Sequence, residues 1–160
     1  MDKAHLLRLI LDRLADDLQL LQRAAQTAYE TATHEENIAE NKYDTLGLEA
    51  SYLATGQARR AAEIRQAIGL YEALVLRPYD PERGIALGAL VCLGHEQGGE
   101  RWLFLGPEAA GLQVQAEGTE VTVITPRAPL GQALLGKREG DEVVVAPAGV
   151  PQVYEVLQVA

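Results

Sequence analysis

About a quarter of the way along the chain lies a group of residues whose types could do chemistry. Residues 33–44 read Thr-His-Glu-Glu-Asn-Ile-Ala-Glu-Asn-Lys-Tyr-Asp, with carboxylates at Glu35, Glu36, Glu40 and Asp44. Carboxylate oxygens suit a hard divalent cation, and His34 could bind a metal or carry a proton. An acidic cluster is more often a solvated loop than a metal site, and Asn37 and Asn41 are typical turn residues. The residues alone therefore leave a metal site and a solvated turn both open.

Two amphipathic segments flank this cluster and must position it. The first carries apolar residues at spacings of 4, 3, 4, 3, 4, 3 and 4, namely Leu7, Leu11, Leu14, Leu18, Leu21, Ala25, Ala28 and Ala32. This is the heptad seam of a coiled coil. The second carries a less regular stripe between Leu46 and Val75. Both seams become alanine-rich towards the cluster, where small residues would let two helices approach closely.

The two segments either fold back on each other or continue as a single rod. No glycine or proline marks residues 33–44, so spacing alone does not prove a reversal. A continuous rod of about 70 residues would be roughly 105 Å long and would have to dimerise to bury its seam. A hairpin would bury the seam within one chain and give arms of roughly 45 Å.

Residues 78–160 follow a different pattern, because they hold all 7 prolines and 12 of the 15 glycines. We expect a helical domain over 1–77, a linker over 78–84 and a sheet domain over 85–160. The sheet domain shows β-rich runs and turn signals, which predict four or five antiparallel strands. The expected strands are 88–93, 101–105, 120–124, 141–146 and 153–159. A short helix is expected over Ala128–Gly136, starting near a proline and ending at a glycine.

Composition narrows the function classes. The chain has 160 residues and a formal net charge of −9, which argues against wrapping or sequence-specific binding of duplex DNA, because such affinity comes mainly from neutralising phosphates. Its one cysteine, Cys92, excludes an internal disulfide and a cysteine zinc cluster. No secretion leader and no apolar run of about 20 residues is visible. We therefore expect a cytoplasmic protein with no membrane partner.

The C-terminal half carries a specific resemblance. The run Thr125–Val143, Thr-Pro-Arg-Ala-Pro-Leu-Gly-Gln-Ala-Leu-Leu-Gly-Lys-Arg-Glu-Gly-Asp-Glu-Val, resembles the signature of bacterial Gre-type (GreA/GreB) transcription elongation factors. The closing Tyr154–Leu157 resembles the last strand of that family. Ala128 stands where the family usually has serine, and Gln132 where it has arginine. The resemblance extends over nearly the whole chain and implies an α+β fold: an antiparallel coiled-coil hairpin, a linker and an FKBP-like sheet domain.

The resemblance also implies a function. Members of this family dock on RNA polymerase and insert the coiled coil into its secondary channel, close to the RNA 3′ end. Acidic tip residues there help to hold a Mg²⁺ shared with the polymerase, which then cleaves backtracked RNA by two-metal chemistry. The protein would be an accessory factor, not an enzyme, with no cofactor of its own. A monomer is expected.

Alignment of the tip exposes one departure from the family. Active members carry Gly-Asp-Leu-x-Glu-Asn, and matching Glu40 and Asn41 to the final pair places Asn37 on the aspartate and Glu36 on the glycine. An amide oxygen can ligate Mg²⁺ but lacks the charge of a carboxylate. Glu36, four positions before Glu40, could substitute for it. The resemblance thus assigns the tip chemistry to Glu36, Asn37 and Glu40, with Glu36 and Glu40 as Mg²⁺ ligands.

Other charged residues are candidate partner contacts. They are Glu35, Asp44, Arg59, Arg60, Lys137 and Arg138. Each has a plainer alternative: a solvated helix face for the two arginines of the second helix, and a cap at the end of the short helix for Lys137. Two other functions remain open, namely a secondary-channel regulator or inhibitor that does not stimulate cleavage, and a non-catalytic coiled-coil adaptor.

Overall fold

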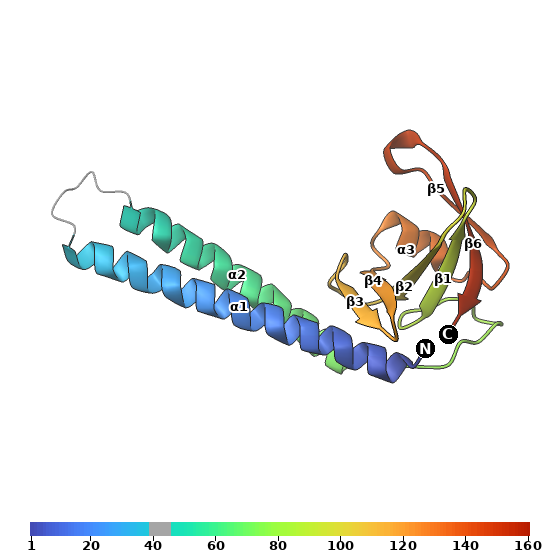
Figure 1. The fold of residues 1–160 in the computed structure, drawn as a ribbon, viewed down its shortest axis with the longest axis horizontal. Coiled ribbons are helices and arrows are strands. Elements are labelled where there is room, and N and C mark those ends of the chain that lie inside the picture. Colours follow the sequence, from blue (N-terminus) through green and yellow to red (C-terminus); the bar gives the residue numbers. More distant parts are fainter. Residues whose placement is uncertain (39–45) are drawn as a thin grey trace. The chain divides into compact units, whose positions relative to one another are not determined.

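The computed structural model describes residues 1–38 and 46–160, and for residues 32, 33, 35–38 and 46–54 the backbone alone. Two long helices, α1 (Lys3–Ile38) and α2 (Leu46–Glu72), run side by side in opposite directions (Figure 1). After them come β1 (Leu90–His95), β2 (Glu100–Leu105), β3 (Gln113–Ala116), β4 (Thr119–Ile124), α3 (Pro129–Leu134), β5 (Glu142–Val145), the 3₁₀ turn η1 (Pro147–Gly149) and β6 (Gln152–Val159). None of the described helices is long and apolar enough to cross a membrane. The expected α+β fold is confirmed.

The chain divides into two compact units. One comprises Met1–Leu11 together with Gly69–Ala160, and the other comprises Asp12–Ile68. The start of α1 and the last turn of α2 therefore belong to the same unit as the sheet. The second unit holds the middle of both helices.

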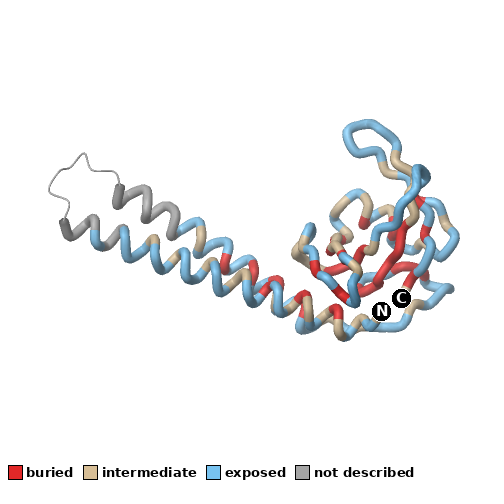
Figure 2. The backbone as a smooth tube through the Cα atoms, viewed as in Figure 1, coloured by how far each residue is buried: buried red, intermediate tan, exposed pale blue. Residues whose placement is uncertain are grey.

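Burial along α1 follows the predicted seam except at its start (Figure 2). The less exposed positions from Leu14 onward include the predicted Leu18, Leu21, Ala25 and Ala28. Before Leu14 the fully buried residues are Leu6 and Ile10, whereas the predicted Leu7 and Leu11 are half-buried. Leu6, Ile10 and Leu14 are four residues apart. A step of four exceeds the 3.6-residue turn, so the buried stripe moves around the helix here and does not keep the alternating spacing of a heptad. The helix begins where the Asp2 carboxylate accepts a hydrogen bond from the Ala4 amide at 2.9 Å.

Helix α1 extends into the segment predicted as the turn. Residues 33–38 are helical, so α1 continues to Ile38 and the remaining part of the predicted turn, 39–45, lies outside the described residues. At its other end, α2 stops at Glu72, before the predicted apolar stripe ends at Val75. Proline at position 78 disfavours a helical conformation for the residue before it, and the bond from the Leu74 amide to the Tyr71 carbonyl at 3.2 Å closes the helix earlier.

The sheet is six-stranded, in the order β3-β4-β2-β1-β6-β5, and it is mixed and not purely antiparallel. Four pairings are antiparallel, but β2 and β4 are parallel, with Trp102 opposite Val121 and Leu105 opposite Ile124. The expected strands are all present within a few residues, and β3 is an additional one. After β2 the chain runs back in the opposite direction through β3, and it then reverses again into β4, which is therefore parallel to β2.

Buried side chains line both faces of the sheet, as alternation along the strands requires. On one face Val91, Leu103 and Val156 pack with Leu134 of α3. The opposite face carries the buried Leu90, Cys92, Phe104, Val121 and Val123. Phe104, Tyr154 and Cys92 lie in the buried core, and Trp102 is half-buried.

The end of the predicted linker is fixed to the end of α3. The amide of Ile85 donates to the Lys137 carbonyl and the amide of Gly136 donates to the Ile85 carbonyl, both at 2.8 Å. Gly84 has a φ of +78°, and a Cβ added there would lie 2.3 Å from the Gly136 carbonyl oxygen. Only glycine fits this crossing of two backbones.

Candidate functional site

The predicted acidic tip is described only in part. Glu35, Glu36 and Asn37 lie in the last turn of α1, where the structure gives the backbone alone, while Glu40 and Asp44 lie outside the described residues. His34 is exposed. Among the side chains that the structure describes, no group of three His, Cys, Asp or Glu could hold a metal ion. The ligand set at the tip therefore remains a prediction.

The backbone of α1 does bear on the electrostatics of this tip. The C-terminal end of a helix carries a partial negative charge, which favours cations and disfavours carboxylates by about 0.3–1 kcal/mol each. Yet the last turn of α1 contains two glutamates and no basic residue. A sequence that breaks a local rule in this way commonly does so at a functional site. The partial negative charge at this end of α1 favours a cation, and the part of the two glutamates in holding one stays a prediction.

The two arginines predicted to contact a partner lie on the exposed surface of α2. Arg60 forms a 3.7 Å ion pair with Glu63, in which both side chains are more than half exposed. Such pairs contribute little to stability, so Arg60 can exchange this partner for another. Arg59 is also exposed. Both arginines are accessible to solvent, and their contact with a partner stays a prediction.

Near Arg59 and Arg60, the alanine-rich seam leaves a hollow between α1 and α2. It has a volume of about 650 Å³ and is lined by Gln22, Ala25, Gln26, Tyr29, Thr55, Ala58, Ala61 and Arg65. Small side chains were expected to bring the helices close together here. The hollow shows that alanine at these positions leaves space unfilled at this level.

Lys137 and Arg138 follow α3 in the sheet-containing unit. The backbone amide of Lys137 donates to the Leu134 carbonyl at 2.9 Å. The end of α3 is thus capped by this amide, while no hydrogen bond of the Lys137 ammonium is found among the described residues. Arg138 donates from its guanidinium to the Glu82 carbonyl at 3.3 Å. These two residues and the two arginines of α2 lie in different compact units.

One polar anchor was not foreseen from the sequence. Tyr71, at the end of α2, is fully buried and donates from its hydroxyl to the Glu108 carbonyl at 2.7 Å. Burial, and then the nearby Glu108 carboxylate, raise the pKa of Tyr71 well above its ordinary value, so the hydroxyl keeps its proton. The Glu108 carboxylate in turn accepts from Arg127 at 2.8 Å, just before α3. In the sequence Tyr71 is only one member of an apolar stripe, so nothing marked its hydrogen bond.

Removing the Tyr71 hydroxyl should cost stability. In Tyr71→Phe the Glu108 carbonyl loses its donor, and we expect the free energy of unfolding to fall by about 1–2 kcal/mol. Urea denaturation measures the change. Tyr29→Phe is the control, because Tyr29 is 62% exposed and should change stability by less than about 0.5 kcal/mol. Equal effects of the two substitutions would contradict the anchoring role of Tyr71.

Comparison with known proteins identifies the family. The model described as "Transcription elongation factor, GreA/GreB, C-term" matches residues 81–160. Transcription elongation factor GreA of Syntrophobacter fumaroxidans is 33% identical over 156 residues, covering 92% of each chain. GreA of Nitratidesulfovibrio vulgaris is 32% identical over 156 residues, covering 93% of this chain and 89% of that protein.

A solved structure also matches along most of the chain. The GreA factor homolog 1 (Gfh1) of Thermus thermophilus is 24% identical, with 94% of both chains covered and a TM-score of 0.38. A structural match at this level carries no argument. The family is shown by the sequence similarity to GreA over 92% of the chain and by the family-model match over residues 81–160. The chain belongs to the GreA/GreB family of transcription elongation factors.

Proposed function

We propose that this protein binds bacterial RNA polymerase, inserts its helical hairpin into the secondary channel and stimulates cleavage of backtracked RNA. The observation that carries the proposal is the similarity to GreA along 92% of the chain. It includes the segment that holds the acidic tip as well as the sheet domain. The protein acts as an accessory factor, and the bond-breaking chemistry belongs to the polymerase.

The dimensions of the hairpin support insertion into a channel. α1 has 36 residues, which corresponds to about 54 Å at 1.5 Å per residue. A pair of antiparallel helices is narrow for its length, and its seam is buried within one chain. Such an element can carry a few side chains deep into a second protein while the rest of the molecule stays outside.

The donor set at the tip fits Mg²⁺. Glu36 and Glu40 supply carboxylate oxygens and Asn37 supplies an amide oxygen, the ligand types that Mg²⁺ takes while keeping several waters. A Mg²⁺ shared with the polymerase would stabilise charge on the attacking and leaving oxygens during RNA cleavage. The role of this chain is to present the oxygens near the metal, with the partial negative charge at the C-terminal end of α1 adding to the attraction.

One observation favours a second function, a channel regulator without cleavage activity. Asn37 stands at the position where active relatives carry aspartate, so one unit of negative charge is absent from the tip. Charge supplies most of the hold of a carboxylate on a cation. A protein of this kind would still bind polymerase and fill the channel, but would leave the cleavage rate unchanged or lower it.

Two measurements test the proposal together. Binding to the cognate polymerase, followed by fluorescence anisotropy at increasing salt, should be detected and should weaken as screening increases. Addition of the protein to a stalled, backtracked elongation complex at fixed Mg²⁺ should accelerate RNA cleavage. Binding without acceleration would support the regulator. Absence of binding would overturn both functions and leave the coiled-coil adaptor.

A further inference from the structure

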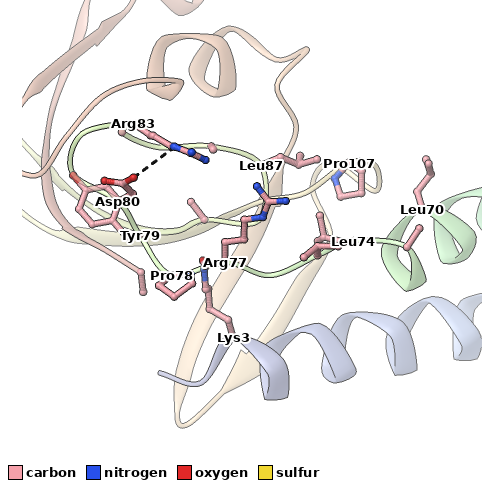
Figure 3. Close-up of a pocket in the computed structure, with 16 residues that line it drawn as sticks. Lys3, Leu70, Leu74, Arg77, Pro78, Tyr79, Asp80, Arg83, Leu87 and Pro107 are labelled. Atoms are coloured by element: carbon pink, nitrogen blue, oxygen red, sulfur yellow. Dashed lines mark hydrogen bonds and ion pairs between the residues drawn. The ribbon is translucent and has the colours of Figure 1, made fainter.

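An open groove in the sheet-containing unit is not used by the proposed function. It has a volume of about 510 Å³ and lies beside the residues that follow α2 and the Pro78–Gly84 turn (Figure 3). The side chains that matter for its chemistry are Lys3, Val75, Arg77, Arg83 and Leu87. All belong to the unit formed by Met1–Leu11 and Gly69–Ala160, so the groove is a feature of one folded body.

Cationic side chains outnumber acidic side chains in the groove, in a protein of net charge −9. Lys3, Arg77 and Arg83 line it, together with the acidic Asp80 and the last residue of the sequence, Ala160. Asp80 forms a 3.6 Å ion pair with Arg83, at the side of the groove away from α2 (Figure 3). The Arg77 guanidinium has no hydrogen bond or ion pair to any described residue. A negatively charged group entering the groove would therefore meet an unneutralised cation.

Lys3, at the start of α1, is a further cation in the groove lining (Figure 3). Its ammonium donates to the carbonyls of Arg77 and Gly88 and has no carboxylate partner among the described residues. Loss of solvent around it lowers the pKa of Lys3, because burial without a counter-charge disfavours the charged form. An anion bound near the Lys3 ammonium would stabilise its charged form and so offset part of the desolvation cost.

The rim of the groove is apolar. Leu70 is 41% exposed, Leu87 is 45% exposed and Val75 is 65% exposed, and all three line this one groove. Scattered apolar side chains on a surface need no explanation, but apolar residues gathered around a concave site with polar groups mark an interaction site. A highly charged nucleic acid would leave this apolar rim unused, and the net charge of the chain opposes it.

We propose that this groove binds an acidic, apolar peptide segment of a partner protein. One or more carboxylates of the segment would face Arg77 and Arg83, and large aliphatic side chains next to them would cover Val75 and Leu87. This inference does not depend on the tip or on the proposed function, because none of the residues involved belongs to the tip.

Peptide binding to the full chain tests the proposal directly. The probe is a short fluorescein-labelled peptide of alternating glutamate and leucine, compared with two versions in which serine replaces leucine or lysine replaces glutamate. We expect the first peptide to bind at least about tenfold more tightly than either control, since both charge and apolar contact contribute. Amide NMR signals of Gly84 and Gly88 should shift on binding and locate the peptide in the groove.

Matched variants then distinguish peptide binding in the groove from nonspecific binding elsewhere on the surface. The double variant Arg77→Glu/Arg83→Glu should weaken binding by about tenfold or more, and Leu87→Ser by about fivefold. Arg101→Glu, a charge reversal on β2 outside the groove, should leave affinity unchanged. Val75→Ser replaces Leu87→Ser if thermal unfolding shows that the latter is not folded.

Each remaining outcome overturns the proposal. No binding of the acidic, apolar peptide would remove the groove as a docking site. Equal binding of the serine version would show attraction by charge alone, and equal loss in Arg101→Glu would show that the whole surface responds. None of these assays contains polymerase, so their result is separable from the success or failure of the proposed function.

Discussion

Asn37→Asp is expected to raise the rate of backtracked-RNA cleavage by about tenfold or more, which corresponds to about 1.4 kcal/mol of transition-state stabilisation. The substitution adds one negative charge at the position where active relatives carry aspartate. At an effective dielectric constant of about 20, a charge about 4 Å from a monovalent cation contributes up to about 4 kcal/mol. The channel of a polymerase screens the pair less than bulk water does. The expected gain is therefore well within what one carboxylate can supply.

The measurement is RNA cleavage in a stalled, backtracked complex with the cognate polymerase at fixed Mg²⁺. Wild type, Asn37→Asp and the double variant Glu36→Ala/Glu40→Ala are compared, and polymerase binding is measured for each. The control is Asn41→Asp, which adds the same charge at a position where the family keeps asparagine. It should not reproduce the gain.

Each pattern of rates has a distinct meaning. Acceleration by wild type that is lost in Glu36→Ala/Glu40→Ala would show that the tip works as a metal arm despite Asn37. A silent wild type with an active Asn37→Asp would identify a channel regulator that lacks cleavage activity because of one amide. An equal gain from Asn41→Asp would contradict the metal-ligand role of position 37 and indicate a general effect of negative charge. If no variant accelerates RNA cleavage and none binds polymerase, the remaining function is that of a non-catalytic coiled-coil adaptor.

Gly84→Ala should destabilise the sheet domain by about 4 kcal/mol. A left-handed φ costs a residue with a Cβ about 1–2 kcal/mol, and Gly84 has a φ of +78°. The new methyl group would also meet the Gly136 carbonyl oxygen at 2.3 Å, so that the two backbones must separate. Separation strains the two hydrogen bonds between Ile85 and residues 136–137, adding about 1 kcal/mol for each and an overpacking cost of similar size.

The glycine at position 118 provides a matched control. Gly118 has a φ of +77°, and a Cβ there would meet no atom within 4 Å. Gly118→Ala therefore carries the backbone strain without the collision and should cost about 1–2 kcal/mol. Urea denaturation of the two variants beside wild type measures the difference. If Gly84→Ala costs no more than Gly118→Ala, the close approach of the linker to the end of α3 does not restrict this position.

Much of the fold was predictable because its signals are local. The heptad spacing of α1 and the β-rich runs each reflect which side chains one element must bury, and the structure has these elements in the expected order. The proline near the start and the glycine at the end of residues 128–136 likewise marked α3. The start of α1 differs because Leu6 and Ile10 are the buried pair there. Which of two neighbouring apolar positions is buried depends on what packs against the helix, and no local pattern records it.

The parallel pairing of β2 and β4 could not be predicted from the sequence. The direction of pairing is set by where the chain turns between strands, and β3 that makes the turn is only four residues long, Gln-Val-Gln-Ala. One valine between glutamines gives no β-branched run, so the usual strand signal is absent. At the tip the prediction rests on aligned residue types. The positions of Glu36 and Glu40 side chains depend on the chain reversal itself, which spacing does not determine.

The strand order has a consequence for synthesis of the chain on the ribosome. β1 lies between β2 and β6, and the amides of Leu90 and Ala160 donate to each other's carbonyls at 3.0 and 2.8 Å. Leu90 and Ala160, about 70 positions apart in the sequence, must therefore pair. At a synthesis rate of 5–20 residues per second, Leu90 is made about 4–14 seconds before Ala160. During that interval Leu90–Leu93 is an apolar strand with one edge unpaired, the kind of segment that invites aggregation. A nascent chain that stops before β6 would expose this edge permanently and become a substrate for chaperones and proteases.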